Sequence, residues 1–179
     1  MGAQGITIIV PIAWKLDRDE HGTIICGAGT REACDHAVKI AQKTPSSLIL
    51  LTPTNAGADW EHEAMCKVMA GYIKVQAPDI PQTISQAPWF NTMGEVTAAA
   101  SYIARCKQEV PVKKVIFVVK SWHLRRLRMI ARVIFKGRNL DVPVEYATHS
   151  VHAPILDRTI RELGAFVFNS LHLRHIGYH

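Results

Sequence analysis

Short runs of apolar, often β-branched residues alternate along this chain with longer segments in which apolar residues recur every three or four positions. A short continuous apolar run is typical of a buried strand, and the longer spacing is typical of one face of a helix. The runs that predict strands cover residues 5–12, 23–26, 46–52, 83–86, 113–120, 142–147 and 165–169. The segments that predict helices cover residues 30–43, 59–74, 91–109, 124–136 and 154–163.

This alternation predicts an α/β fold with a Rossmann-like, mainly parallel sheet and helices on both faces. Parallel neighbours need crossover connections, which are right-handed, and a helix usually supplies each of them. Residues 113–120 form the clearest strand, because their apolar run suits a strand covered on both faces. We expect a single domain over residues 1–179, with its ligand site beyond the carboxyl ends of the strands.

Composition and charge limit the class of protein without choosing its partner. Hydrophobic residues make up 48% of the 179 residues and charged residues 20%, which is ordinary for a globular domain. No apolar run reaches the roughly 18 residues that a spanning helix needs, so we expect no membrane anchor and a cytoplasmic location. The four cysteines have no C-x-x-C spacing, which favours free thiols. The net charge of +6 permits a phosphate ligand, nucleic acid or a membrane surface as partner.

The strongest candidate site directly follows the clearest strand, in the segment 120–126 (KSWHLRR). It opens a helix at a strand's carboxyl end, where parallel sheets bind their ligands. His123 can act as an acid, a base or a donor near neutral pH. Arg126 can hold a phosphate or carboxylate with two N–H groups. Ser121 either caps the helix or contacts the ligand.

Helical geometry separates the two arginines of this segment. At roughly 100° per residue, Arg126 falls on the flank of the helix beside His123. The other basic residues fall on one line, here called the basic stripe: Arg125, Arg128, Arg132 and Lys136. We therefore expect Arg126 to turn into the crevice at the strand ends, and the basic stripe to face solvent.

Two further segments precede helices and are candidates for anion binding. In residues 27–31 (GAGTR), the glycines let the backbone approach an anion, Thr30 is predicted to cap the helix, and Arg31 supplies charge. The dinucleotide fingerprint needs a third glycine where Glu32 stands, so a plain turn and a ligand loop both stay open. Asn91-Thr92 is a predicted cap whose helix would also point N–H groups at an anion.

Histidine spacing gives no convincing metal site. Residues 62–66 (HEAMC) nearly match the zinc-protease pattern H-E-x-x-H, but Cys66 stands where the second histidine belongs. His149 and His152 form an H-x-x-H pair in a predicted loop, and three more histidines share a helical spacing only at residues 172–179, near the chain end. We expect no structural metal.

Taken in order, these segments resemble the YdcF-like family, which includes SanA-like and ElyC-like proteins. The matching residues, over about residues 5–150, are Arg31, Glu63, Ala64, Asn91, Thr92, Ser121, His123 and Arg126. The chain departs from the family pattern where residues 52–55 (TPTN) replace S-G-G, where Trp89 replaces a Ser, and where Gly94 replaces an acidic residue. The resemblance implies a Rossmann-like domain, S-adenosylmethionine binding as reported for one member, and a link of other members to envelope biogenesis.

These features together predict a small anionic, nucleotide-like ligand, with S-adenosylmethionine as a candidate cofactor. The expected ligand-binding residues are Arg31, Asn91, Thr92, Ser121 and Arg126. If the protein is an enzyme, His123 is the candidate acid or base of a transfer or hydrolysis reaction. No acidic cluster suited to metal-dependent phosphoryl transfer is evident. The alternative function is nucleic-acid binding through the basic stripe on the helix at 124–136.

Overall fold

A parallel sheet of five strands organises the protein in the computed structural model, which describes residues 5–52, 62–85 and 91–149. Its strands are β1 (Ile6–Pro11), β4 (Ser47–Leu51), β5 (Gln82–Ile84), β6 (Val112–Lys120) and β7 (Val144–His149). Their order across the sheet is β5-β4-β1-β6-β7, and every neighbouring pair is parallel. The first strand is central and later strands add on either side of it, as in the doubly wound arrangement. The predicted Rossmann-like α/β class is therefore confirmed.

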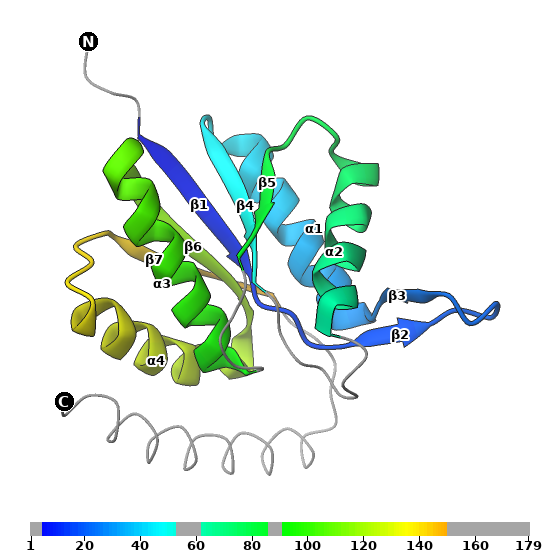
Figure 1. Cartoon of the computed structure of the whole chain (residues 1–179). Coiled ribbons are helices and arrows are strands. Elements are labelled where there is room, and N and C mark those ends of the chain that lie inside the picture. Colours follow the sequence, from blue (N-terminus) through cyan, green and yellow to red (C-terminus); the bar gives the residue numbers. More distant parts are fainter. Residues whose placement is uncertain (1–4, 53–61, 86–90, 150–179) are drawn as a thin grey trace.

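Helices cover both faces of this sheet (Figure 1). They are α1 (Ala28–Lys43), α2 (His62–Gln76), α3 (Thr92–Glu109) and α4 (Leu124–Gly137). α1 and α2 pack against one face, whereas α3 and α4 pack against the other. Within the described residues no helix combines the length and apolar character needed to cross a membrane.

The alternation of side chains along the strands divides the core into two layers. On β1, Ile8 and Val10 pack toward α3 and α4, while Ile9 between them packs toward α1 and α2. On β6, Phe117 lies on the α3–α4 side, where its ring contacts Phe135 at a centroid distance of 6.2 Å. Both faces are apolar because both are covered, which explains the continuous apolar runs in the sequence.

A hairpin follows β1. Its second strand lies within the strand predicted at 23–26, whereas its first strand was not predicted. Strands β2 (Leu16–Arg18) and β3 (Ile24–Cys26) pair antiparallel in a separate two-stranded sheet. Gly22 closes the turn with a φ of 77°, a left-handed conformation that glycine adopts without strain. β2 pairs over only three residues, Leu16–Arg18, which are too few for a recognisable alternating pattern.

The start of α1 differs from its prediction at Thr30. The helix begins at Ala28, and Gly27 is its N-cap, with a carbonyl that accepts from the N–H of Thr30 and of Arg31 at 2.9 Å. The Thr30 hydroxyl instead accepts from the backbone N–H of Trp14 and Lys15 at 3.1 Å and donates to the Lys15 carbonyl at 2.7 Å. A buried Thr30 thus fastens α1 to the loop after β1, and its predicted capping role was wrong.

Other predicted elements agree to within a few residues. The strand predicted at 142–147 pairs as β7 from Val144, because Val142 packs in the core without joining the ladder. The four cysteines are free, as predicted, and three of them are buried. The predicted helix 154–163 and strand 165–169 lie outside the described residues, as does the predicted start of the second helix at residue 59.

Candidate functional site

Polar side chains gather where the carboxyl ends of β1, β6 and β7 meet at one edge of the sheet. β1 is the central strand, with β4 on one side and β6 on the other, so the strand order reverses beside it. A reversal of this kind leaves room between the loops that follow the two strands, which is where open α/β sheets bind ligands. Here those loops are residues 12–15 after β1 and a single 3₁₀ turn, Ser121–His123, after β6.

His123 joins two helices on the α3–α4 side of this edge. Its Nε2 atom lies 3.2 Å from the Oγ1 atom of Thr92, the first residue of α3. The same Nε2 lies 2.7 Å from the Nη2 atom of Arg126, in the first turn of α4. His123 and Arg126 are both buried, at 4% and 9% exposure. Three residues named from the sequence therefore form one connected group, here called the His123 group.

The partners of His123 fix its protonation state. A guanidinium only donates hydrogen bonds, so Nε2 must accept from Arg126, and the ring proton of the neutral tautomer lies on Nδ1. Burial, and then the charges of Arg126 and Lys120, lower the pKa of His123 to about 3. In this geometry the ring is a neutral acceptor that orients Arg126. A proton-transfer role for His123 stays a prediction.

Glu95 lies within the same region, in the first turn of α3. Its side chain is 1% exposed, and its Oε1 atom accepts a long hydrogen bond, 3.4 Å, from the backbone N–H of Ala13 after β1. Burial raises the pKa of Glu95 well above its usual range, although the Ala13 N–H and the charge of Arg126 oppose this. The raised pKa favours a neutral carboxyl group, which leaves the positive charge of Arg126 less compensated.

Lys120 ends β6 on the other side of the sheet edge. It is 5% exposed, and its Nζ atom lies 3.8 Å from the ring centroid of Trp14 and 5.7 Å from that of Trp122. The two indoles meet edge to face, with centroids 5.1 Å apart. A Cβ atom on Gly29 in the first turn of α1 would lie only 2.6 Å from Nζ, so glycine is needed there. Burial lowers the pKa of Lys120 to about 8.

A histidine and a glutamate complete this side. The Nδ1 atom of His149, the last residue of β7, lies 3.1 Å from the Oε2 atom of Glu32 in α1. His149 is the direct partner of Lys120 in the pairing of β6 with β7. Paired residues of neighbouring strands project from the same face of a sheet, so both side chains turn toward α1. We call Lys120, His149 and Glu32 the Lys120 group.

The remaining predicted site residues have other surroundings. Asn91 caps α3, because its Oδ1 atom accepts from the N–H of Gly94 at 2.9 Å, as the sequence predicts. Ser121 is exposed in the 3₁₀ turn, and α4 begins after His123 with no side-chain cap. Arg31 is exposed on α1, and among the described residues no hydrogen bond or ion pair links it to the His123 group. The structure thus brings together Thr92, His123 and Arg126, but not Arg31.

Sequence reasoning did not single out Lys120, Glu95, Glu32 or His149 as partners in this site. One signal was available for Lys120, since a lysine at the end of a run of five buried apolar residues is seldom solvated. The His149–Glu32 contact spans 117 residues and depends on α1 crossing the sheet toward β7. No local pattern contains that information.

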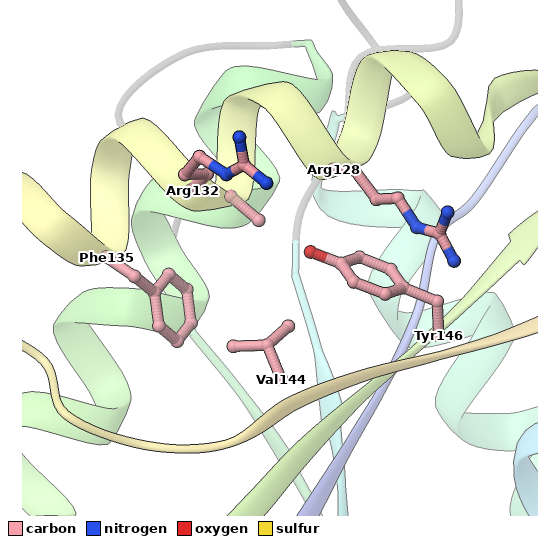
Figure 2. Close-up of a pocket in the computed structure, with 6 residues that line it drawn as sticks. Arg128, Arg132, Phe135, Val144 and Tyr146 are labelled. Atoms are coloured by element: carbon pink, nitrogen blue, oxygen red, sulfur yellow. The ribbon is translucent and has the colours of Figure 1, made fainter.

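The basic stripe faces solvent on α4, as its spacing predicts. Arg125, Arg128, Arg132 and Lys136 are all exposed, whereas Leu127, Ile130, Ala131 and Ile134 on the opposite face are buried. Two of these arginines border a pocket between α4 and β7, shown in Figure 2. Its other labelled side chains are Phe135, Val144 and Tyr146, and the guanidinium of Arg128 lies 5.3 Å from the Tyr146 ring centroid. The pocket combines positive charge with aromatic surface.

Within the described part of the chain, no group of three or more potential metal-ligating side chains is present. The side chain of His62 and the histidines at 152 and 172–179 lie outside the described residues, so those spacings stay without a structural account. Comparison with protein-family models, with curated proteins and with solved structures finds no match.

Proposed function

We propose that this protein is a YdcF-like domain that binds a small anionic, nucleotide-like ligand at the carboxyl ends of its strands. S-adenosylmethionine is the candidate cofactor, and transfer or hydrolysis at an activated group is the candidate reaction. We expect the domain to act in the cytoplasm. The resemblance in residue order motivates the family, and the geometry of the strand ends motivates the ligand class.

The observation that carries the proposal is a buried guanidinium held in place at the reversal of strand order. His123 accepts from Arg126 at 2.7 Å and contacts Thr92 at 3.2 Å, so the guanidinium is oriented before any ligand arrives. Glu95 has a pKa raised by burial and is a weak counter-charge for Arg126. An oriented cation in a partly dry crevice binds phosphate or carboxylate more strongly than one on the surface.

A ligand screen followed by paired substitutions tests this proposal. Thermal shift against nucleotides, sugar nucleotides and S-adenosylmethionine identifies the ligand, and calorimetry then measures its affinity for Arg126→Lys and Arg125→Lys variants. Each variant keeps one positive charge and loses the planar guanidinium. We expect Arg126→Lys to cost at least ~1.5 kcal/mol in binding, the scale of a charge-assisted hydrogen bond. Arg125→Lys should cost less than ~1 kcal/mol, since it lies on an exposed surface.

Two outcomes would reject the crevice. Equal losses of affinity in the two variants would place the ligand on the basic stripe. If none of the anionic nucleotides tested binds, the proposed class of ligand is rejected. Because Arg126 is buried, urea unfolding of each variant accompanies the calorimetry. A loss of binding is attributed to the lost contact only if the unfolding curves show that both variants are folded under the conditions of the calorimetry.

Nucleic-acid binding through α4 is the second candidate function, and the exposure of the basic stripe is the observation that favours it. All four cations of the stripe face solvent, and the pocket in Figure 2 places two of them, Arg128 and Arg132, beside the aromatic side chains of Phe135 and Tyr146. Nucleic-acid sites often combine cations with aromatic side chains in this way. Affinity for a short oligonucleotide should then fall steeply with salt, with a slope of about −0.7 per phosphate contacted on a single strand. Crevice binding of a nucleotide would fall much less over the same salt range.

A further inference from the structure

Lys120 is the most unusual titratable group that the proposed ligand contacts leave unused. Lysine is seldom buried without a carboxylate partner, yet Lys120 is 5% exposed at the end of β6. In the described part of the chain its ammonium group makes neither a hydrogen bond nor an ion pair. Its close neighbours are instead the faces of Trp14 and Trp122 and the backbone of Gly29.

These surroundings act on the protonation of the amine. Burial lowers the pKa of Lys120 to about 8, the charge of Lys15 lowers it further, and the carboxylate of Glu32 opposes both effects. The indole faces also favour the charged form and so limit the decrease. A substantial share of the amine is therefore neutral close to physiological pH, and a neutral amine is a nucleophile.

A second buried polar residue lies on the neighbouring strand, at the position paired with Lys120. His149 pairs with Lys120 in register, and its Nδ1 atom is engaged by Glu32 at 3.1 Å. This contact leaves Nε2, which is buried and has no hydrogen-bond partner in the described structure. A carboxylate on Nδ1 fixes the tautomer with its proton there, so Nε2 is an acceptor that can take and return a proton.

We propose that Lys120 is the nucleophile of a covalent reaction with an aldehyde or ketone carried by the crevice ligand. The Lys120 nitrogen attacks the carbonyl carbon, and a proton moves from nitrogen to oxygen through Nε2 of His149. Departure of that oxygen as water leaves a carbon–nitrogen double bond, the Schiff base. No oxidant or reductant is needed, because one amine and one carbonyl give one imine and one water.

This inference rests on the proposed crevice for its ligand and narrows the ligand to one that bears both an anionic group and an aldehyde or ketone. S-adenosylmethionine has neither an aldehyde nor a ketone and is therefore not the reaction partner of Lys120. The two parts of the site divide the work. The His123 group would hold the anion on the α3–α4 side, and the Lys120 group would meet the carbonyl on the α1 side. Trp122 lies between the two groups. Its ring stacks on the His123 ring, with centroids 5.8 Å apart, and its ring centroid lies 5.7 Å from the Nζ atom of Lys120.

Reductive trapping with a defined probe tests the proposal. The full chain is mixed with pyridoxal 5′-phosphate, an aldehyde that carries a phosphate, and sodium borohydride then converts any imine into a stable amine for peptide mapping. Near about pH 7.5, a lysine with a pKa of about 8 holds about 200-fold more neutral amine than one at the ordinary pKa of 10.5. A less basic amine is also a weaker nucleophile. We expect labelling at Lys120 at least ~10-fold faster than at Lys15, which is half-exposed and paired with Asp17 at 2.7 Å.

Two variants separate covalent reaction from simple anion attraction. His149→Gln keeps a side chain of similar size and should slow labelling of Lys120. The increase in melting temperature that inorganic phosphate causes, measured by thermal shift, should be the same in this variant as in the native protein. Gly29→Ala places a Cβ atom against the Lys120 amine and should reduce labelling by displacing it. Lys15→Arg is the matched control, since it removes a neighbouring lysine without touching the buried amine, and labelling at Lys120 should persist.

The outcomes are decisive in either direction. Labelling that spreads evenly over exposed lysines, or that leaves Lys120 unmodified, overturns the proposal, as does a His149→Gln variant that labels at the native rate. If Lys120 forms the adduct but the Arg126→Lys variant binds the ligand as tightly as the native protein does, the Lys120 chemistry is upheld and the proposed anion site at Arg126 is rejected. If Lys120 forms no adduct but the Arg126→Lys variant binds the ligand more weakly, the Schiff base is rejected and the anion site at Arg126 is upheld.

Discussion

Replacing His123 with glutamine should remove a large part of the acid sensitivity of this protein. In the folded state the ring is buried and its Nε2 atom already accepts from Arg126, so a proton has no place on that atom. In the unfolded chain the ring titrates at its ordinary pKa of 6.5, whereas in the folded protein the pKa is about 3. Glutamine keeps an oxygen acceptor for Arg126 and does not titrate.

The magnitude follows from the difference in proton binding. Below pH 6.5 the unfolded chain takes up a proton that the folded protein refuses, so stability is lost as the pH falls, until both states are protonated near pH 3. The full dependence is about 1.4 kcal/mol per pH unit, but the unfolded ring is only half protonated at pH 6.5, so the loss between pH 6.5 and about pH 5 is about 1.6 kcal/mol. Glu95 acts in the opposite sense, because its raised pKa favours folding at low pH and loses that contribution as the pH rises. Glu95 is present in both proteins and largely cancels in their difference.

Urea unfolding monitored by tryptophan fluorescence measures this effect. The free energy of unfolding is recorded at several pH values for the native protein and for His123→Gln. Their difference should change by about 1.6 kcal/mol over the roughly 1.5 pH units below pH 6.5, in favour of the variant. Ile130→Val, which weakens the same core without a titrating group, should give a curve parallel to the native one. Parallel curves for His123→Gln would show that His123 takes up a proton when folded and would refute the acceptor geometry.

Two further predictions concern the packing that supports the site. Thr30→Val should destabilise the protein by about 3 kcal/mol in urea unfolding, because it removes the three partly buried hydrogen bonds that the Thr30 hydroxyl makes with the N–H groups of Trp14 and Lys15 and with the Lys15 carbonyl. Thr30→Ser, which keeps the hydroxyl, should recover most of that loss, and equal losses would show that the hydrogen bonds contribute little. Phe117→Ala should cost about 3–5 kcal/mol by leaving a cavity between β6 and α4, and a loss below ~1.5 kcal/mol would indicate a core that collapses to fill it.

Local pattern was sufficient to predict the α/β class, the main helices and strands, and that Arg125 is exposed whereas Arg126 turns inward. Those features depend on periods of two or 3.6 residues, which the sequence displays directly. The partners of each side chain were harder to predict, because they depend on strand order. Thr30 binds the loop after β1 rather than its own helix, and Glu32 reaches His149 across 117 residues. Lys120 lies opposite His149 only because β7 aligns beside β6 in one register.

The two polar groups stand on opposite faces of a single sheet edge, each backed by its own apolar layer. The sheet otherwise keeps these layers apart, and each layer opens to solvent by its own local fluctuations. A ligand that contacted both Arg126 and Lys120 would bridge the two faces at that edge, and its binding would stabilise both layers against local opening. Amide protons of α1 and of α4 would then exchange more slowly together when the ligand is present. Binding at the basic stripe alone would slow exchange on the α4 side only.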